Sequence, residues 1–212
     1  MPDRISPTPR PTDMTTFTIR VGGEELPGTY RVVSIDIARV INRIATASLV
    51  FHDGNPATQD FVLSSAERLI PGQAIEIEGG YAGEETLLFT GVITRQQIKA
   101  RRKGESHLRI ECQDPAYRLT LARKSRYFKD TTEGEVFEEI VGAYGDLAVD
   151  AEATEASRPD MVQYRVSDWD FIVSRAEALG MVCITGNGTL KIGKPDLGQD
   201  PVASVAYGAG IY

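Results

Sequence analysis

Residues 162–183 read VQYRVSDWDFIVSRAEALGMVC, and the only tryptophan of the chain lies here between two aspartates, where a strand-like run gives way to a helix-like one. Two carboxylates beside an aromatic ring suit two interpretations. One is a catalytic or sugar-binding site, and the other is the start of a helix. The choice between them decides whether this stretch carries chemistry.

The order of the polar residues favours a helix start. With Ser167 as the N-cap, Asp170 falls at the third helical position, and SDWD is a capping box in which Asp replaces Glu. Asp168 and Asp170 then lie in the first turn, where the helix dipole favours negative charge. Gly180 suits the left-handed position that follows a helix. We therefore predict that Ser167, Asp168, Trp169, Asp170 and Gly180 form a structural motif.

An apolar stripe runs along the same helix, and we expect it to be buried because its members recur about every 3.6 residues. Val166 and Phe171 are placed to form a hydrophobic staple around the N-cap. Every unusual feature of the stretch then has a structural explanation, and catalysis is the less favoured alternative. The stripe consists of Trp169, Ile172 or Val173, Ala176 and Leu179.

Alternation of apolar and polar residues dominates the chain from Thr16 to about Gln113. In QAIEIEGG (residues 73–80), for example, isoleucine alternates with glutamate. Alternation repeated in several segments indicates half-buried antiparallel strands, and clusters of turn residues separate these segments. Several strands joined by hairpins predict a β-barrel or a closed sandwich.

After Asp114 the pattern changes to a mixture of helix and strand. A short helical turn is expected at 114–121, an amphipathic helix begins after Thr131 or Thr132 and ends near Gly145, and residues 150–160 suggest a polar loop. The second helix, within 167–180, is followed by a hairpin. The predicted fold class is mainly β with an α+β part, a barrel followed by an α/β subdomain. Its divisions are a flexible proline-rich arm at 1–14, the barrel at 15–114, the subdomain at 115–200 and one further strand at 201–212.

Several functional classes receive no support from composition. No run approaches 18 apolar residues, so no membrane anchor is predicted, and the proline-rich start lacks the apolar core of a secretory signal. Cys112 and Cys183 are far apart and match no metal-binding spacing, which predicts buried free thiols in a reducing compartment. We expect no metal, no cofactor and no enzymatic activity, because the chain also lacks the common nucleophile, phosphate-binding and zinc motifs.

The charge is unevenly distributed along the chain. Residues 95–129 contain 11 Lys or Arg and three acidic residues, a net charge of +8, whereas the remainder contains 12 basic and 27 acidic residues, a net charge of −15. A basic and an acidic face favour oriented docking, and they also suit nucleic-acid binding. We predict that Arg101, Arg102 and Lys103, at a hairpin tip, form an interaction site, although an ordinary solvated turn is an open alternative. Because exposed aromatic residues are not interleaved with these charges, no nucleic-acid partner is expected.

Two segments resemble the hub proteins of contractile injection machines. GQAIEIEGGYAGEETLLFTGVITR (residues 72–95) resembles their barrel strands, and QYRVSDWDFIVSRAEALGM (residues 163–181) resembles a segment in which Gln-Tyr, Ser-Asp, an aromatic pair and a helix ending in Gly occur in that order. The related proteins are the VgrG spikes of type VI secretion, the late control D proteins of contractile-tailed phages and the baseplate hubs of extracellular injection systems. The resemblance covers about residues 15–212.

The resemblance implies a structural hub that joins a tail tube to a central spike. In that family three subunits, each with two similar barrels, form a ring around a channel, which implies a homotrimer with tail tube, spike or needle and baseplate proteins as partners. It also implies assembly in the bacterial cytoplasm, followed by incorporation into a virion or injection particle. Residues 201–212 resemble the entry strand of a second barrel, so we expect the chain to be a piece of a longer protein. The alternatives are an oligonucleotide-binding barrel and, less favoured, a cell-wall hydrolase.

Overall fold

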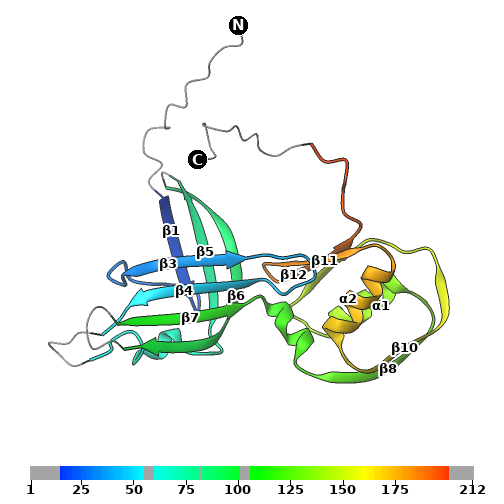
Figure 1. The fold of residues 1–212 in the computed structure, drawn as a ribbon, viewed down its shortest axis with the longest axis horizontal. Coiled ribbons are helices and arrows are strands. Elements are labelled where there is room, and N and C mark those ends of the chain that lie inside the picture. Colours follow the sequence, from blue (N-terminus) through cyan, green and yellow to red (C-terminus); the bar gives the residue numbers. More distant parts are fainter. Residues whose placement is uncertain (1–14, 55–59, 82, 101–105, 201–212) are drawn as a thin grey trace, which may run out of the picture.

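A curved antiparallel sheet forms the first part of the structure. The computed structural model describes residues 15–54, 60–81, 83–100 and 106–200 (Figure 1). Seven strands pair in the order β2-β1-β5-β6-β7-β4-β3, and a short 3-10 helix, η1, precedes β5. Their bounds are β1 (Thr15–Val21), β2 (Glu24–Glu25), β3 (Val32–Ala38), β4 (Thr46–His52), η1 (Glu67–Leu69), β5 (Ala74–Tyr81), β6 (Glu84–Lys99) and β7 (His107–Gln113).

The predicted alternation explains how this sheet encloses a core. Ile75 and Ile77 of β5 are fully buried, while Glu76 between them is exposed. The sheet bends strongly, so that β1 crosses the direction of β3 and β4 steeply (Figure 1). Bulges in β6, where it pairs with β5 and with β7, contribute to this twist. One apolar cluster with members from β1 to β7 fills the interior, and the predicted fold class, mainly β and antiparallel, is confirmed.

Strands and helices alternate in the second part of the chain. An antiparallel ribbon of β8 and β10 curves around the two helices, and a separate small sheet has the order β11-β12-β9, with β9 parallel to β12 (Figure 1). The bounds are η2 (Pro115–Thr120), β8 (Arg123–Thr132), α1 (Glu133–Gly142), β9 (Ala148–Ala151), β10 (Ser157–Ser167), α2 (Asp168–Ala178), β11 (Val182–Gly186) and β12 (Thr189–Gly193). We refer to residues 15–113 as the sheet region and to residues 115–193 as the α/β region.

Two predictions made for this part need correction. The polar loop expected at 150–160 is confirmed only for residues 152–156, because residues 150–151 end β9 and residues 157–160 begin β10. Residues 157–160 are all exposed, so the ribbon has no buried face there and its sequence shows no alternation. Helix α1 ends at Gly142, one turn before Gly145, and Thr132 is its N-cap in a complete capping box with Glu135.

Helix α2 begins and ends as the sequence predicted. Ser167 Oγ accepts a hydrogen bond from the backbone N–H of Asp170, and Trp169 is only 7% exposed. The predicted capping box is incomplete: the Asp170 carboxylate accepts from Ser167 Oγ at 2.5 Å, whereas Glu135 of α1 also accepts from the backbone N–H of its N-cap, consistent with the Asp side chain being one methylene shorter. Gly180 has a φ of +70°, and its N–H and that of Met181 donate to the carbonyls of the last turn.

The two regions are joined by hydrogen bonds between buried groups. Thr185 Oγ1 of β11 accepts from the backbone N–H of Ala45 at 2.7 Å, and Asn42 Oδ1 accepts from the N–H of Cys183 at 2.8 Å. Asp114, which has no exposed surface, caps η2 with one carboxylate oxygen and accepts from the N–H of Gly188 with the other. The β11–β12 hairpin therefore lies directly against the sheet region.

Candidate interaction site

The first residue of α2 is a buried carboxylate held by side chains from other elements. Asp168 has no exposed surface, and its Oδ2 lies 2.7 Å from Lys124 Nζ and 3.5 Å from an Nη atom of Arg126, both in β8. The Tyr144 hydroxyl donates to the same oxygen at 2.7 Å, and Gln163 Nε2 donates to Oδ1 at 2.8 Å. Burial alone would raise the pKa of Asp168, but these hydrogen bonds hold it below its ordinary value.

The first residue of α1 has the same arrangement. Glu133 has no exposed surface, and its Oε1 accepts from Arg158 Nε at 3.1 Å and from Arg175 Nη2 at 2.6 Å. Burial opposes ionisation here as well, yet the two arginines hold the pKa of Glu133 below its ordinary value. Each helix of the α/β region therefore begins with a buried, ionised carboxylate that two cations neutralise.

Antiparallel pairing of β8 with β10 explains why the two arrangements match. Each ribbon strand leads directly into a helix, so its last residues are followed by the carboxylate. The register pairs Ser167 with Arg123 at one end of the ribbon and Ser157 with Thr132 at the other. The carboxylate after one strand thus meets cations near the start of the other strand. In β8 these are Lys124 and Arg126, and in β10 the cation is Arg158, joined by Arg175 of α2.

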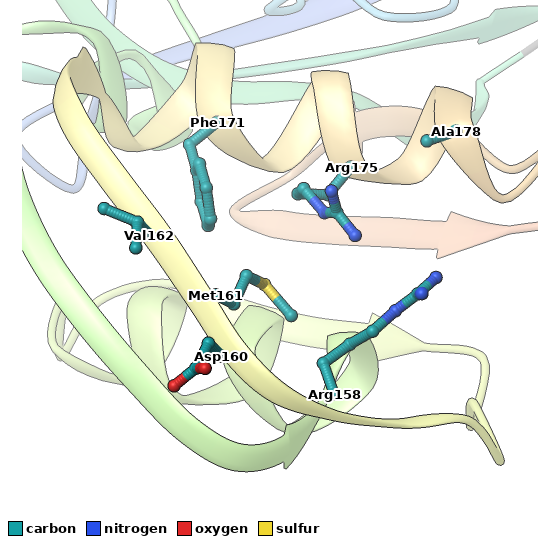
Figure 2. Close-up of a pocket in the computed structure, with 7 residues that line it drawn as sticks. All are labelled: Arg158, Asp160, Met161, Val162, Phe171, Arg175 and Ala178. Carbon is teal, nitrogen blue, oxygen red and sulfur yellow. The ribbon is translucent and has the colours of Figure 1, made fainter.

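A groove lies beside the Glu133 ion pairs, between β10 and one stripe of α2. Its volume is about 400 Å³. Figure 2 shows Phe171 and Arg175 extending from α2 toward β10, and Arg158 extending from β10 toward Arg175. We call it the β10–α2 groove; it is lined by Arg158, Asp160, Met161, Val162, Phe171, Arg175 and Ala178.

The β8–β10 ribbon also exposes aromatic and apolar side chains near this groove. Tyr127 of β8 is paired with Val162 of β10, and these residues are 60% and 57% exposed. Tyr164, two residues further along β10, is 72% exposed. Asp160 accepts a hydrogen bond from the Tyr127 hydroxyl, and its side chain points away from the two arginines of the groove (Figure 2).

The predicted basic interaction site, Arg101, Arg102 and Lys103, lies outside the described residues. Four other cations of the basic segment 95–129 pair with carboxylates instead of forming an open basic face. Arg95 contacts Glu111, Arg118 contacts Asp146, and two cations of β8 hold Asp168. The charge asymmetry in the sequence is therefore partly compensated within the α/β region.

The sequence located Asp168 but missed the residues that hold it. Lys124 and Arg126 lie in β8, Gln163 lies in β10 and Tyr144 lies in the turn after α1, and Glu133 was not singled out from the sequence. One signal was present. A hydroxyl residue followed by an acidic residue begins both helices, as Thr132-Glu133 and Ser167-Asp168. The strand that leads into each helix also contains basic residues, which pair with the carboxylate of the other helix.

Cys112 and Cys183 are buried free thiols, as predicted, and burial raises the pKa of each to about 12. Within the described residues, no group of three or more His, Cys, Asp or Glu side chains is placed to hold a metal ion. No described helix is both long enough and apolar enough to cross a membrane.

Comparison with solved structures defines the class of fold. A tail protein from Neisseria meningitidis is similar with a TM-score of 0.66 at 18% identity, over 89% of this chain and 53% of that protein. A prophage tail protein from Shewanella oneidensis has a TM-score of 0.67 at 14% identity, over 84% of this chain and 53% of that protein. A type VI secretion component of E. coli has a TM-score of 0.61 at 14% identity, over 82% of this chain and 48% of that protein.

These likenesses show that the chain has the fold of phage tail and type VI secretion proteins, and that it spans about half the length of the first three. The model of the Alg8 N-terminal domain family matches residues 11–212, and the chain belongs to that family. No curated protein matches the chain. The resemblance to VgrG proteins is thus supported at the level of the fold. A PdpA–VgrG complex of Francisella is also similar, with a TM-score of 0.58 at 13% identity, over 84% of this chain and 28% of that protein.

Proposed function

We propose that the protein is a structural hub component of a contractile injection machine or phage tail, joining the tail tube to the central spike. The observation that supports this most strongly is the extent of the fold likeness. It runs through the sheet region and the α/β region together, over 82–89% of the chain, in three tail and secretion proteins. A generic β-barrel binder would match the sheet region alone.

The rigid junction between the regions suits a structural role. Hydrogen bonds from Asn42, Thr185 and Asp114 fix the β11–β12 hairpin to the sheet region through groups that are buried or nearly so. A component that transmits load between a tube and a spike needs such a fixed angle between its parts. In this proposal the protein has no catalytic residues, and the buried carboxylates stabilise the fold.

The test is to purify contractile particles from cells that produce the protein and to locate the chain with antibodies under the electron microscope. We expect labelling at one end of each particle, where the tube meets the spike. Particles that lack the protein, or that carry it along their whole length, would contradict the hub role. Quantitative mass spectrometry should give three copies per particle for a trimeric hub.

Within this proposal Arg101, Arg102 and Lys103 orient docking on an acidic surface of the tube or of a neighbouring subunit. Rim charges of this kind mainly accelerate association and are screened by salt. Reversing all three to Glu should slow assembly of hub and tube at low ionic strength and have little effect above about 0.5 M salt. Assembly at the unmodified rate in low salt would mean that these residues form only a solvated turn.

Oligonucleotide binding is the second candidate, favoured by one observation. Tyr127 and Tyr164 are exposed on the ribbon close to the cations Lys129 and Arg165, an arrangement that suits base stacking. Fluorescence anisotropy with labelled oligothymidylate at 50 and 200 mM salt tests it. Salt-sensitive binding that is lost in a Tyr127→Ala and Tyr164→Ala double variant would favour this candidate over the hub.

A further inference from the structure

The β10–α2 groove contains more positive than negative charge directed into it. Arg158 and Arg175 share one buried oxygen, Glu133 Oε1. Asp160, the acidic residue of the lining, accepts a hydrogen bond from Tyr127 and points away from the arginines (Figure 2). Two cations facing one carboxylate leave this end of the groove with an excess of one positive charge.

Part of each guanidinium group remains open to a ligand, because the side chains of Arg158 and Arg175 are 47% and 30% exposed. Arg175 donates to Glu133 through Nη2, while its Nε is shielded from solvent and has no partner among the described residues. Glu133 Oε2 is likewise buried and unpartnered within this part of the chain. Arg175 Nε and Glu133 Oε2 are a donor and an acceptor of the same ion pair and both are shielded from solvent, so a ligand would meet the exposed part of each arginine instead. A carboxylate is the acceptor that fits an arginine edge best, because it can accept two parallel N–H bonds.

The other part of the groove is apolar. Met161 and Phe171 belong to the buried core of the α/β region and still line the groove, and Val162 is 57% exposed at its border. An apolar side chain that enters here would lose water-exposed surface against both elements. The volume of about 400 Å³ holds a few side-chain groups and excludes a folded domain.

We propose that the β10–α2 groove is a docking site for an acidic peptide segment of a partner protein. A carboxylate of the segment lies against Arg175 and Arg158, and a neighbouring large apolar side chain packs on Met161 and Phe171. Four residues of β10, three of them consecutive (Asp160, Met161 and Val162), and three residues of α2 spaced about one turn apart line the groove, which suits an extended segment.

The probe is a displayed library of random ten-residue peptides selected on the 212-residue chain. We expect the enriched peptides to contain Asp or Glu within two residues of Leu, Ile, Phe or Met. A synthetic peptide of the enriched sequence should bind at least ten times more tightly than its Asn or Gln counterpart. Failure to enrich peptides, or enrichment without an acidic residue, would overturn the proposal.

Two exposed positions of β10 provide a matched pair of variants that spare the buried ion pairs. Val162→Glu adds a negative charge at the border of the groove, and Tyr164→Glu adds the same charge on the same strand outside the lining. We expect Val162→Glu to weaken peptide binding at least tenfold, Val162→Lys to preserve it, and Tyr164→Glu to change it less than threefold. Equal effects at the two positions would mean that the peptide binds elsewhere on the ribbon.

A second copy of the chain could occupy the groove in place of a peptide, and sedimentation distinguishes self-association from peptide docking. We expect the sedimentation coefficient of the chain to be the same with and without Val162→Glu. Concentration-dependent oligomers that this substitution dissolves would assign the groove to a second copy and overturn the proposal. None of these results depends on where the protein lies in a particle, so the hub role is tested separately.

Discussion

The cores of the sheet region and the α/β region are stabilised in different ways. The sheet region has an apolar core, and Asp53, a buried acidic residue just after β4, accepts hydrogen bonds from the backbone N–H groups of Gly54, Leu63 and Ser64. The α/β region buries Glu133 and Asp168 completely and neutralises them with four cations.

The difference follows from how much apolar surface each architecture can cover. A curved sheet of seven strands directs its buried side chains into one apolar cluster, so apolar packing is enough to stabilise its core. In the α/β region, a two-stranded ribbon curves around two short helices, and among the described residues no further strand pairs with its edges. Ribbons of two strands are marginal without additional packing. Ion pairs that cross the ribbon fix its strands to the helices.

The largest effect is expected from removing apolar volume in the sheet region. Phe51 has no exposed surface, and Phe51→Ala should lower the free energy of unfolding by about 3–5 kcal/mol through lost burial and a residual cavity. Circular dichroism reports the sheets, while fluorescence of Trp169 reports the α/β region. We expect both signals to shift together in urea, because the junction couples the two regions. A shift confined to circular dichroism would show that the regions unfold independently.

Removing one charge in the α/β region should have an effect of comparable size. Asp168→Asn keeps the shape of the side chain but leaves two cations without their carboxylate, and we expect a loss of about 3 kcal/mol. The low end of the usual range applies because Lys124 and Arg126 are 32% and 25% exposed and can turn toward water. The control is Asp150→Asn, whose exposed pair with Lys191 should contribute less than about 1 kcal/mol. Equal effects of the two substitutions would remove the contrast between the regions.

Stability should depend on pH through the same carboxylates. The pKa values of Asp168 and Glu133 are lowered in the folded state, so their contribution is present above the ordinary pKa of about 4 and is lost as the pH falls through the lowered values. Asp114 has the opposite sign, since burial raises its pKa and its contribution is lost as the pH rises. Urea unfolding between pH 3 and pH 7 should show stability falling below about pH 4, and Asp168→Asn should flatten that fall. An unchanged slope would contradict ionisation of Asp168 in the folded protein.

The smallest effect is expected at the helix start that the sequence identified first. Asp170→Ala should lower the free energy of unfolding by no more than about 1 kcal/mol, the loss of one favourable helix-end charge. In contrast to this small effect, truncating the neighbouring Trp169, which is only 7% exposed, should cost about 3–5 kcal/mol in Trp169→Ala. Acrylamide should quench the fluorescence of Trp169 weakly in the folded protein, and strong quenching would contradict its burial.

The sequence by itself determined the local features of both regions. Alternation of isoleucine and glutamate in β5 predicts one buried face, because side chains alternate across a strand. The caps of α2, Ser167 at its start and Gly180 after its end, act within four residues of the chain and are therefore legible in the sequence. The sequence was misinterpreted where the structure depends on residues far apart along the chain. The exposed start of β10 was expected to be a loop, because an unburied strand leaves no periodic pattern.

Tertiary structure alone decided which cations hold the buried carboxylates and where a groove remains. Asp168 and Lys124 are 44 residues apart, and Glu133 and Arg175 are 42 apart, so no local pattern connects them. Their meeting depends on the antiparallel register of β8 and β10 and on the packing of α2 against β10. A shift of that register by one residue would turn these side chains to the opposite face of the ribbon, because the side chains of a strand alternate between its two faces.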